Sequence, residues 1–102
     1  MTATRIIVLF NLKPGISQDE YEAWARTRDL PSVRALPSIA GFDVFRSTGL
    51  LGGGDAPCAY IEIIDVADMA AFGVDVTADP MPAIAAEFGR LADAVFIMTD
   101  RL

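Results

Sequence analysis

The feature that most constrains this chain is its first segment, residues 4–12, in which both alternating sets of side chains are apolar. One set is Ile6, Val8, Phe10 and Leu12, and the other is Ile7 and Leu9, completed by Asn11. A strand with one face in water alternates apolar and polar residues, whereas a strand covered on both faces has no such alternation. We therefore predict a central strand in a sheet whose two faces are both buried.

A helix is predicted after this strand. Ser17 followed by Glu20 has the spacing of a capping box, and the helix would turn an apolar stripe toward the sheet. That stripe is Tyr21, Trp24, Ala25 and Arg28. Because Pro31 disfavours helical geometry at Leu30, we expect the helix to end near Asp29, which would cap a short second turn over residues 32–36.

The remaining pattern predicts a hairpin, a second helix and a last strand. We expect strands over residues 42–46 and 58–64, joined by a glycine-rich, mobile loop at residues 49–55. Asp65 is expected to cap a helical turn over residues 69–72. A helix from Asp79-Pro80 to about Leu91 follows, and residues 94–99 form the final strand.

The order strand, helix, strand, strand, helix, strand predicts a single α+β domain over residues 1–102. This is the ferredoxin-like βαββαβ arrangement, with a four-stranded antiparallel sheet and both helices on one face. The other face would then be a large apolar surface. We expect a second copy to cover it, sheet against sheet, giving a homodimer of the dimeric α/β barrel kind.

Composition excludes several classes of partner. The chain has 102 residues, 53% of them apolar, with a net charge of -6 and no basic cluster, so neither nucleic acid nor a membrane is an expected partner. It contains one cysteine and no secretory signal, which favours a cytoplasmic location. Histidine is absent, which removes the commonest metal ligand and general base. We expect neither metal nor cofactor.

The sequence resembles the RedY-like family, which is found with gene sets for prodigiosin-type and bisindole pigments. The stretches that carry this resemblance are TRIIVLFNLKPG, YEAWARTRDLPSVRALPSIAGFDVFRSTGLL and YIEIIDVADMAAFG, which together cover most of the chain. The resemblance implies a dimeric α/β barrel and a role in secondary metabolism, such as antibiotic biosynthesis. Wider relatives include cofactor-free monooxygenases acting on aromatic polyketides, and the lack of histidine argues against the histidine-dependent mechanisms of other barrels.

Three candidate site residues precede the predicted end of the first helix. Asn11 is a candidate catalytic amide that can donate to a developing oxyanion, or it caps the next turn. Tyr21, as a candidate proton donor, and Trp24, as a binding residue, lie one helical turn apart. They form either an aromatic wall for a planar substrate or part of the core.

The other candidates lie at the helix end and on the hairpin. Asp29 is a candidate general base if burial raises its pKa, or it is only a cap. Arg46 and Glu62 are expected to pair across the hairpin, either to bind substrate or as a structural ion pair. Tyr60 is a further substrate-binding candidate on the same strand as Glu62.

Two other features receive a structural interpretation. Cys58 follows Pro57 and has neither a second cysteine nor a histidine nearby in the sequence to activate it, so we interpret it as a small apolar residue. The glycine-rich loop lacks the lysine and the following helix of a phosphate-binding loop. We expect this loop to act as a flap at the mouth of the cleft.

Three functions remain open at this stage. The first is a cofactor-independent enzyme that cyclises, condenses or rearranges a nitrogen-containing aromatic intermediate of a pigment pathway by positioning and proton transfer. The second is a cofactor-free monooxygenase, in which the substrate itself activates oxygen. The third is a binding protein that carries an unstable intermediate without reacting with it.

Overall fold

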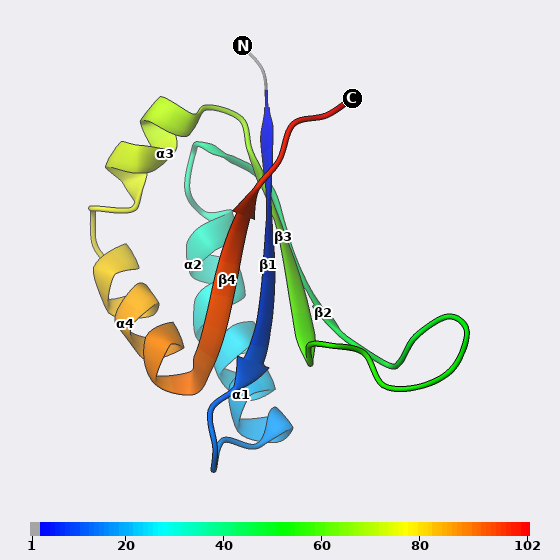
Figure 1. The fold of residues 1–102 in the computed structure, drawn as a ribbon. Helices are drawn as coiled ribbons and strands as arrows, with labels where there is room; N and C mark the ends of the chain where they lie inside the picture. Colours follow the sequence, from blue (N-terminus) through cyan, green and yellow to red (C-terminus); the bar gives the residue numbers. More distant parts are fainter. Residues whose placement is uncertain (1–2) are drawn as a thin grey trace.

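The predicted order of elements is confirmed in the structure, a computed structural model that describes residues 3–102 (Figure 1). The strands are β1 (Thr4–Leu12), β2 (Ile39–Arg46), β3 (Tyr60–Val66) and β4 (Ala92–Met98). The helices are α1 (Gln18–Trp24), η1 (Ala25–Asp29), α2 (Leu30–Arg34), α3 (Met69–Asp75) and α4 (Met81–Leu91). None of the helices within residues 3–102 is long and apolar enough to span a membrane.

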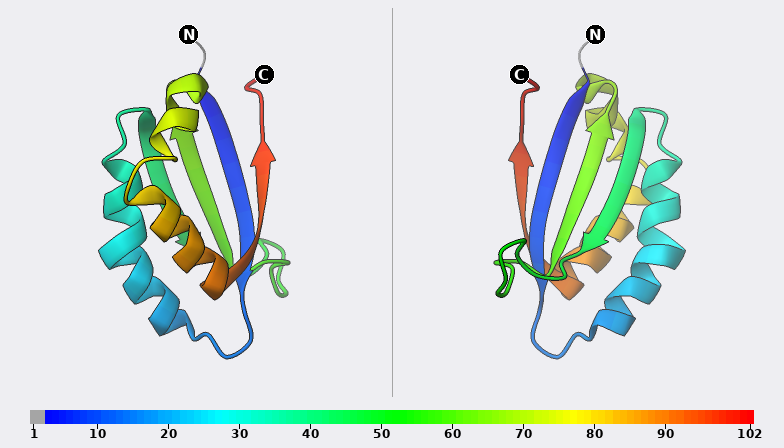
Figure 2. Two further views of the ribbon diagram at one scale, coloured as in Figure 1. Left: turned by 90° about the vertical axis from the view of Figure 1, so that its left-hand side faces the viewer. Right: turned by 90° about the vertical axis from the view of Figure 1, so that its right-hand side faces the viewer.

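The four strands form one antiparallel sheet in the order β2-β3-β1-β4. Within residues 3–102, all helices lie against one face, and none covers the other face, which the right-hand view of Figure 2 presents. Val8 lies opposite Glu62 of β3 on one side and Phe96 of β4 on the other. The central place of β1 is what its doubly apolar sequence predicts.

The pleat of β1 divides its side chains between the two faces. Ile6, Val8 and Phe10 are buried under the helices, while Ile7 and Leu9 are half-buried on the outer face. Since successive side chains of a strand point to opposite faces, the helix-facing set supplies the core and the other set supplies an apolar outer surface. Only one face of the sheet is therefore covered within a single chain.

An aromatic cluster joins α1 to the middle of the sheet. The ring of Phe10 stacks on Tyr60 with centroids 5.2 Å apart, and meets Tyr21 and Phe88 edge-on at 5.3 and 5.1 Å. Aromatic pairs at this separation stabilise a core beyond the area that they bury. The helix itself begins as predicted, because the Ser17 side chain accepts a hydrogen bond from the Glu20 backbone N–H.

The prediction that the first helix ends near Asp29 is wrong. The chain stays helical from α1 through η1 to α2, and η1 is a π-helical segment in which the Leu30 N–H bonds to the Ala25 carbonyl. A proline ring clashes with the carbonyl four residues before it in a regular α-helix, and the wider π turn relieves this crowding ahead of Pro31. The Asp29 side chain makes no capping bond.

Smaller corrections concern the ends of elements. Asp68, not Asp65, caps α3 by accepting from the N–H groups of Ala70 and Ala71, while Asp65 pairs with Arg5 across the sheet. Strands β2 and β3 begin at Ile39 and Tyr60, three residues earlier and two residues later than predicted. These shifts change no pairing that positions the pocket.

We predict that Phe10→Leu lowers the free energy of unfolding by about 2 kcal/mol, because it removes the ring contacts to Tyr21, Tyr60 and Phe88 while keeping most of the apolar volume. Urea denaturation measures this. Val74→Ala is the control, since Val74 is 68% exposed on α3 and its truncation should cost under about 0.5 kcal/mol. Equal losses in the two variants would contradict a central role for the cluster.

Candidate functional site

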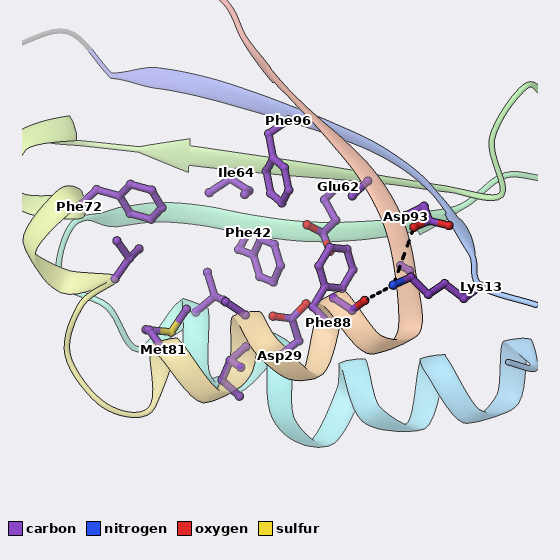
Figure 3. Close-up of a pocket in the computed structure, with 17 residues that line it drawn as sticks. Lys13, Asp29, Phe42, Glu62, Ile64, Phe72, Met81, Phe88, Asp93 and Phe96 are labelled. Carbon is purple, nitrogen blue, oxygen red and sulfur yellow. Dashed lines mark hydrogen bonds and ion pairs between the residues drawn. The ribbon is translucent and has the colours of Figure 1, made fainter.

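A pocket of about 500 Å³ lies between the helices and the covered face of the sheet (Figure 3). Its walls are mostly apolar and come from α2, α3, α4 and the three strands β2, β3 and β4. The main apolar lining residues are Val33, Phe42, Ile64, Phe72, Met81, Ile84, Phe88 and Phe96. A cavity of this size accommodates a small organic molecule, and its few polar groups would set the orientation of that molecule.

Two carboxyl groups enter this pocket from opposite walls. Asp29 points into it from the helix layer, and Glu62 points toward the helices from β3 (Figure 3). They are 6% and 3% exposed, respectively. Among residues 3–102, no hydrogen bond or ion pair reaches either carboxyl group. Buried acidic residues are normally paired, so this arrangement is a candidate functional site.

Burial changes the protonation of both acids. It raises the pKa of Asp29 to about 7, and burial together with the nearby Asp29 charge raises the pKa of Glu62 to about 8. Two neighbouring carboxylates in an apolar site resist ionising together. Near neutral pH the pair therefore retains a proton, and it can both accept and donate one.

Local structure explains why these two acids meet. Asp29 ends the π-helical segment, so its side chain turns into the pocket and is not used as a cap. Glu62 lies between Tyr60 and Ile64 in the buried set of β3, opposite Val44 on one neighbouring strand and Val8 on the other. The sequence signal for Glu62 is an acidic residue at a strand position that faces the helices. The signal for Asp29, its place just before Leu30-Pro31, is weaker.

The expected pair between Arg46 and Glu62 is wrong. Arg46 lies opposite Tyr60 in the sheet and binds Glu22 of α1 through two nitrogen atoms, at 2.7 and 2.5 Å. The Tyr60 hydroxyl donates to the same carboxylate at 2.7 Å. These contacts hold the pKa of Glu22 at about 2, and burial and Glu22 raise that of Tyr60 to about 12. Arg46 and Tyr60 thus line a second pocket, not the main one.

Tyr21 and Trp24 pack beside the main pocket without lining it. Tyr21 is fully buried in the aromatic cluster, and its hydroxyl has no partner among the described residues; burial raises its pKa well above the ordinary value. Trp24 donates from its indole nitrogen to Glu87 at 2.8 Å and stacks on Phe88, which lines the pocket. Neither residue lines the main pocket. Both therefore fit the interpretation as core residues better than the interpretation as an aromatic wall that contacts the substrate.

Asn11 and the glycine-rich loop lie away from the main pocket. Asn11 belongs to the outer set of β1, and its side chain accepts a hydrogen bond from the Ala59 N–H at 2.9 Å. The loop projects on the side of the sheet opposite the helices (Figure 1). Asn11, Gly49 and Asp55 line a third, shallow pocket there. The expectation that the loop closes the main cleft is therefore wrong.

Sequence reasoning missed the groups at one end of the pocket. The Lys13 ammonium group donates to the Gly89 carbonyl at 2.6 Å and lies 3.9 Å from an Asp93 carboxylate oxygen (Figure 3). Both side chains are partly exposed, so they form a polar rim where the apolar walls end. Within residues 3–102, no group of three or more acidic or cysteine side chains is placed to hold a metal ion.

A family model described as REDY-like protein HapK matches residues 4–102. The chain belongs to the RedY-like HapK family. The crystal structure of HapK from Hahella chejuensis is 28% identical, with a TM-score of 0.79 over 97% of this chain and 92% of that one. No match was found among curated protein sequences.

More distant structures share the fold alone. SnoaB from Streptomyces nogalater, a cofactor-independent oxygenase, is 14% identical, with a TM-score of 0.79 over 100% of this chain and 95% of its own. A protein of the dabb family with a ferredoxin-like fold, from Mesorhizobium loti, is 16% identical, with a TM-score of 0.73 over 100% of this chain and 99% of its own. The predicted ferredoxin-like α+β fold of dimeric α/β barrel proteins is confirmed.

We predict that stability falls as the pH rises from about 4 to about 8.5. The folded protein binds more protons than the unfolded chain in this range, because the pKa values of Asp29 and Glu62 are raised. Since one pKa unit corresponds to about 1.4 kcal/mol, Glu62→Gln should be more stable than the wild type by on the order of 2 kcal/mol at the upper pH. The two proteins should be equal near pH 4.

Urea denaturation at both pH values measures this difference. Glu20→Gln is the matched control, because it removes one exposed carboxylate at the start of α1 and should follow the wild type at both pH values. If Glu62→Gln also follows the wild type at pH 8.5, the burial of an ionisable Glu62 is refuted.

Proposed function

We propose that this protein is a cofactor-independent tailoring enzyme of secondary metabolism that acts in the cytoplasm. Its substrate is a flat aromatic intermediate containing nitrogen, from a prodigiosin-type or bisindole pigment pathway. The enzyme promotes cyclisation, condensation or rearrangement of this substrate. The observation that carries the proposal is the pair of buried carboxyl groups, Asp29 and Glu62, inside an apolar pocket. Membership in the RedY-like HapK family supports the secondary-metabolism setting.

The chemistry follows from the protonation of the pair. As a carboxylate, Asp29 removes a proton from a substrate N–H or C–H group, and the resulting anion attacks an electrophilic carbon of the same or a second molecule. Protonated Glu62 donates a hydrogen bond to the oxygen on which negative charge develops. The proton held by Asp29 then returns to the product or to a leaving hydroxide, so that the pair ends in its starting state. The apolar walls hold the reacting atoms together and exclude water.

A cofactor-free monooxygenase is the second candidate. The likeness in fold to SnoaB, a cofactor-independent oxygenase, favours it. In that reaction Asp29 would again remove a substrate proton, and the substrate anion would pass an electron to molecular oxygen before the two combine as a peroxide. The peroxide would take the proton back from Asp29 and lose water, which leaves a carbonyl group on the substrate carbon. The two candidates share their first step and differ in whether oxygen is consumed.

We predict that Asp29→Asn lowers turnover at least tenfold, because an amide cannot accept the proton. The assay incubates the protein with candidate pyrrole and indole intermediates and follows products by mass spectrometry, in air and without oxygen. Product in both atmospheres supports the cyclase-type reaction, and product in air alone supports the monooxygenase.

Glu20→Gln is again the matched control and should react at the wild-type rate, since this exposed carboxylate lies outside the pocket. A wild-type rate in Asp29→Asn would contradict the proposed base. A ligand that binds but remains chemically unchanged in both atmospheres would indicate a carrier protein and not an enzyme.

We also propose that the protein is a homodimer paired through its outer sheet faces. The residues of that face are largely apolar: Ile7, Leu9, Phe45, Ile61, Ile63, Val95 and Ile97. Phe45 on β2 and Val95 on β4, the two edge strands of the sheet, are 50% and 61% exposed in the single chain, and Ile61 and Leu9 lie between them in the same row. An apolar row of this extent is unusual on a surface open to water. A two-fold related copy presents the same surface and covers this face.

We predict that Val95→Glu weakens the dimer at least tenfold, because the two-fold axis brings two added carboxylates into an apolar interface. Analytical ultracentrifugation over a concentration series measures this. Val74→Glu is the control, since Val74 is 68% exposed on α3, away from the sheet, and should leave the dimer intact. A wild-type protein that sediments as a monomer at about 100 μM would refute the proposed pairing.

A further inference from the structure

Each basic side chain of this protein is paired at the surface, held at the rim of the main pocket, or outside its lining. The chain has eight lysines and arginines. Five are paired on the surface: Arg5 with Asp65, Arg26 and Arg46 with Glu22, Arg28 with Glu87, and Arg34 with Asp43. Arg90 and Arg101 are exposed and do not line the pocket. Lys13 lies at the rim, where the Gly89 carbonyl and Asp93 hold it.

Among residues 3–102, the pocket therefore has two acidic groups inside, and its one basic lining residue, Lys13, is held at the rim by other groups. A buried carboxyl group without a hydrogen-bond partner is costly, and a ligand that supplies the partner recovers this free energy on binding. An anionic ligand would add a second negative charge beside the ionised member of the pair in the same apolar space. A ligand without N–H or O–H donors would leave both acids unsatisfied.

The positions of the two acids add a geometric requirement. Asp29 and Glu62 approach the cavity from opposite walls, so a ligand that lies between them faces both carboxyl groups (Figure 3). Phe42, Phe88 and Phe96 line the same space and offer faces for a flat ring and for a cation. An aromatic ring that carries a charged nitrogen group can pack against the phenylalanine rings and donate hydrogen bonds to the carboxyl groups.

We propose that the ligand of this pocket is a flat aromatic compound carrying a protonated or readily protonated nitrogen group, whose N–H donors lie between Asp29 and Glu62, and that aromatic acids are excluded. This inference rests on the proposed function, because it names the charge and orientation of the substrate at the same site. The proposed function says only that the substrate contains nitrogen, whereas this inference specifies that the nitrogen group carries a positive charge. The charge of the ligand now becomes the selecting property.

The test uses three tricyclic probes of the same ring size that differ in charge at pH 7: 9-aminoacridine as a cation, acridine as a largely neutral compound, and acridine-9-carboxylate as an anion. Isothermal titration calorimetry measures each dissociation constant with the wild-type protein. We expect 9-aminoacridine to bind at least tenfold more tightly than acridine, and the carboxylate not to bind at millimolar concentration. Equal binding of all three, tighter binding of the carboxylate, or no binding of 9-aminoacridine overturns the inference.

Variants separate the pocket from the general negative charge of the protein. Asp29→Asn and Glu62→Gln should each reduce the preference for 9-aminoacridine over acridine at least tenfold, while both should bind acridine about as well as the wild type. Glu20→Gln removes the same unit of charge on the surface and should keep the wild-type preference. A loss of preference in Glu20→Gln equal to that in the pocket variants would assign the effect to surface charge and overturn the inference.

This experiment and the turnover assay can fail independently. Selective binding of the cation with no product from any intermediate would refute the enzyme and keep the ligand class. Turnover that depends on Asp29 without any preference for the cationic probe would keep the enzyme and refute the ligand class. Folding of each variant is checked by urea denaturation, and the removal of a buried ionisable group should not destabilise it at pH 7.

Discussion

The structure depends on the burial of β1, the central strand, on both of its faces. Its inward set packs under the helices and builds the aromatic cluster with Tyr21 and Tyr60. Its outward set remains half-buried in a single chain. Because apolar surface of this extent is rarely left in water, the same strand that organises the core also supplies the reason for a partner. The fold and the proposed pairing of two copies thus both depend on one nine-residue segment.

The π-helical segment links this architecture to the chemistry. A regular helix ending at Asp29 would have used the carboxylate as a cap for the next turn, exposed and with an ordinary pKa. The wider turn before Pro31 keeps the chain helical and leaves the Asp29 side chain free to enter the pocket. π segments often occur at functional sites, because one added residue reorients the side chains beside it. Pro31 therefore influences the site without lining it.

The strength of each sequence signal explains which predictions were confirmed. The periodicity of β1, the cap at Ser17 and the stripe of α4 are local patterns, and they gave the element order and the fold. Glu62 and Asp29 were both named as candidates, but their meeting depends on tertiary packing that no local pattern contains. Arg46 was assigned to Glu62 because both lie on the hairpin, while the partner that it binds, Glu22, comes from a helix. Asn11 was misplaced for a different reason, since the parity of β1 already assigned it to the outer face.

The distribution of charge gives the site its chemical character. This protein pairs several partly buried acids at its surface with exposed arginines, and leaves its two most buried acids without a basic partner among residues 3–102. A chain selected for stability alone would carry apolar residues at positions 29 and 62, since replacing buried charges with apolar groups is often stabilising. Retaining the pair lowers stability in the range of neutral pH, and a ligand that satisfies both carboxyl groups reverses that loss. The two carboxyl groups that lower the stability of the folded protein are then the groups that bind the ligand and transfer its proton. A cofactor-independent acid and base requires such groups with shifted pKa values.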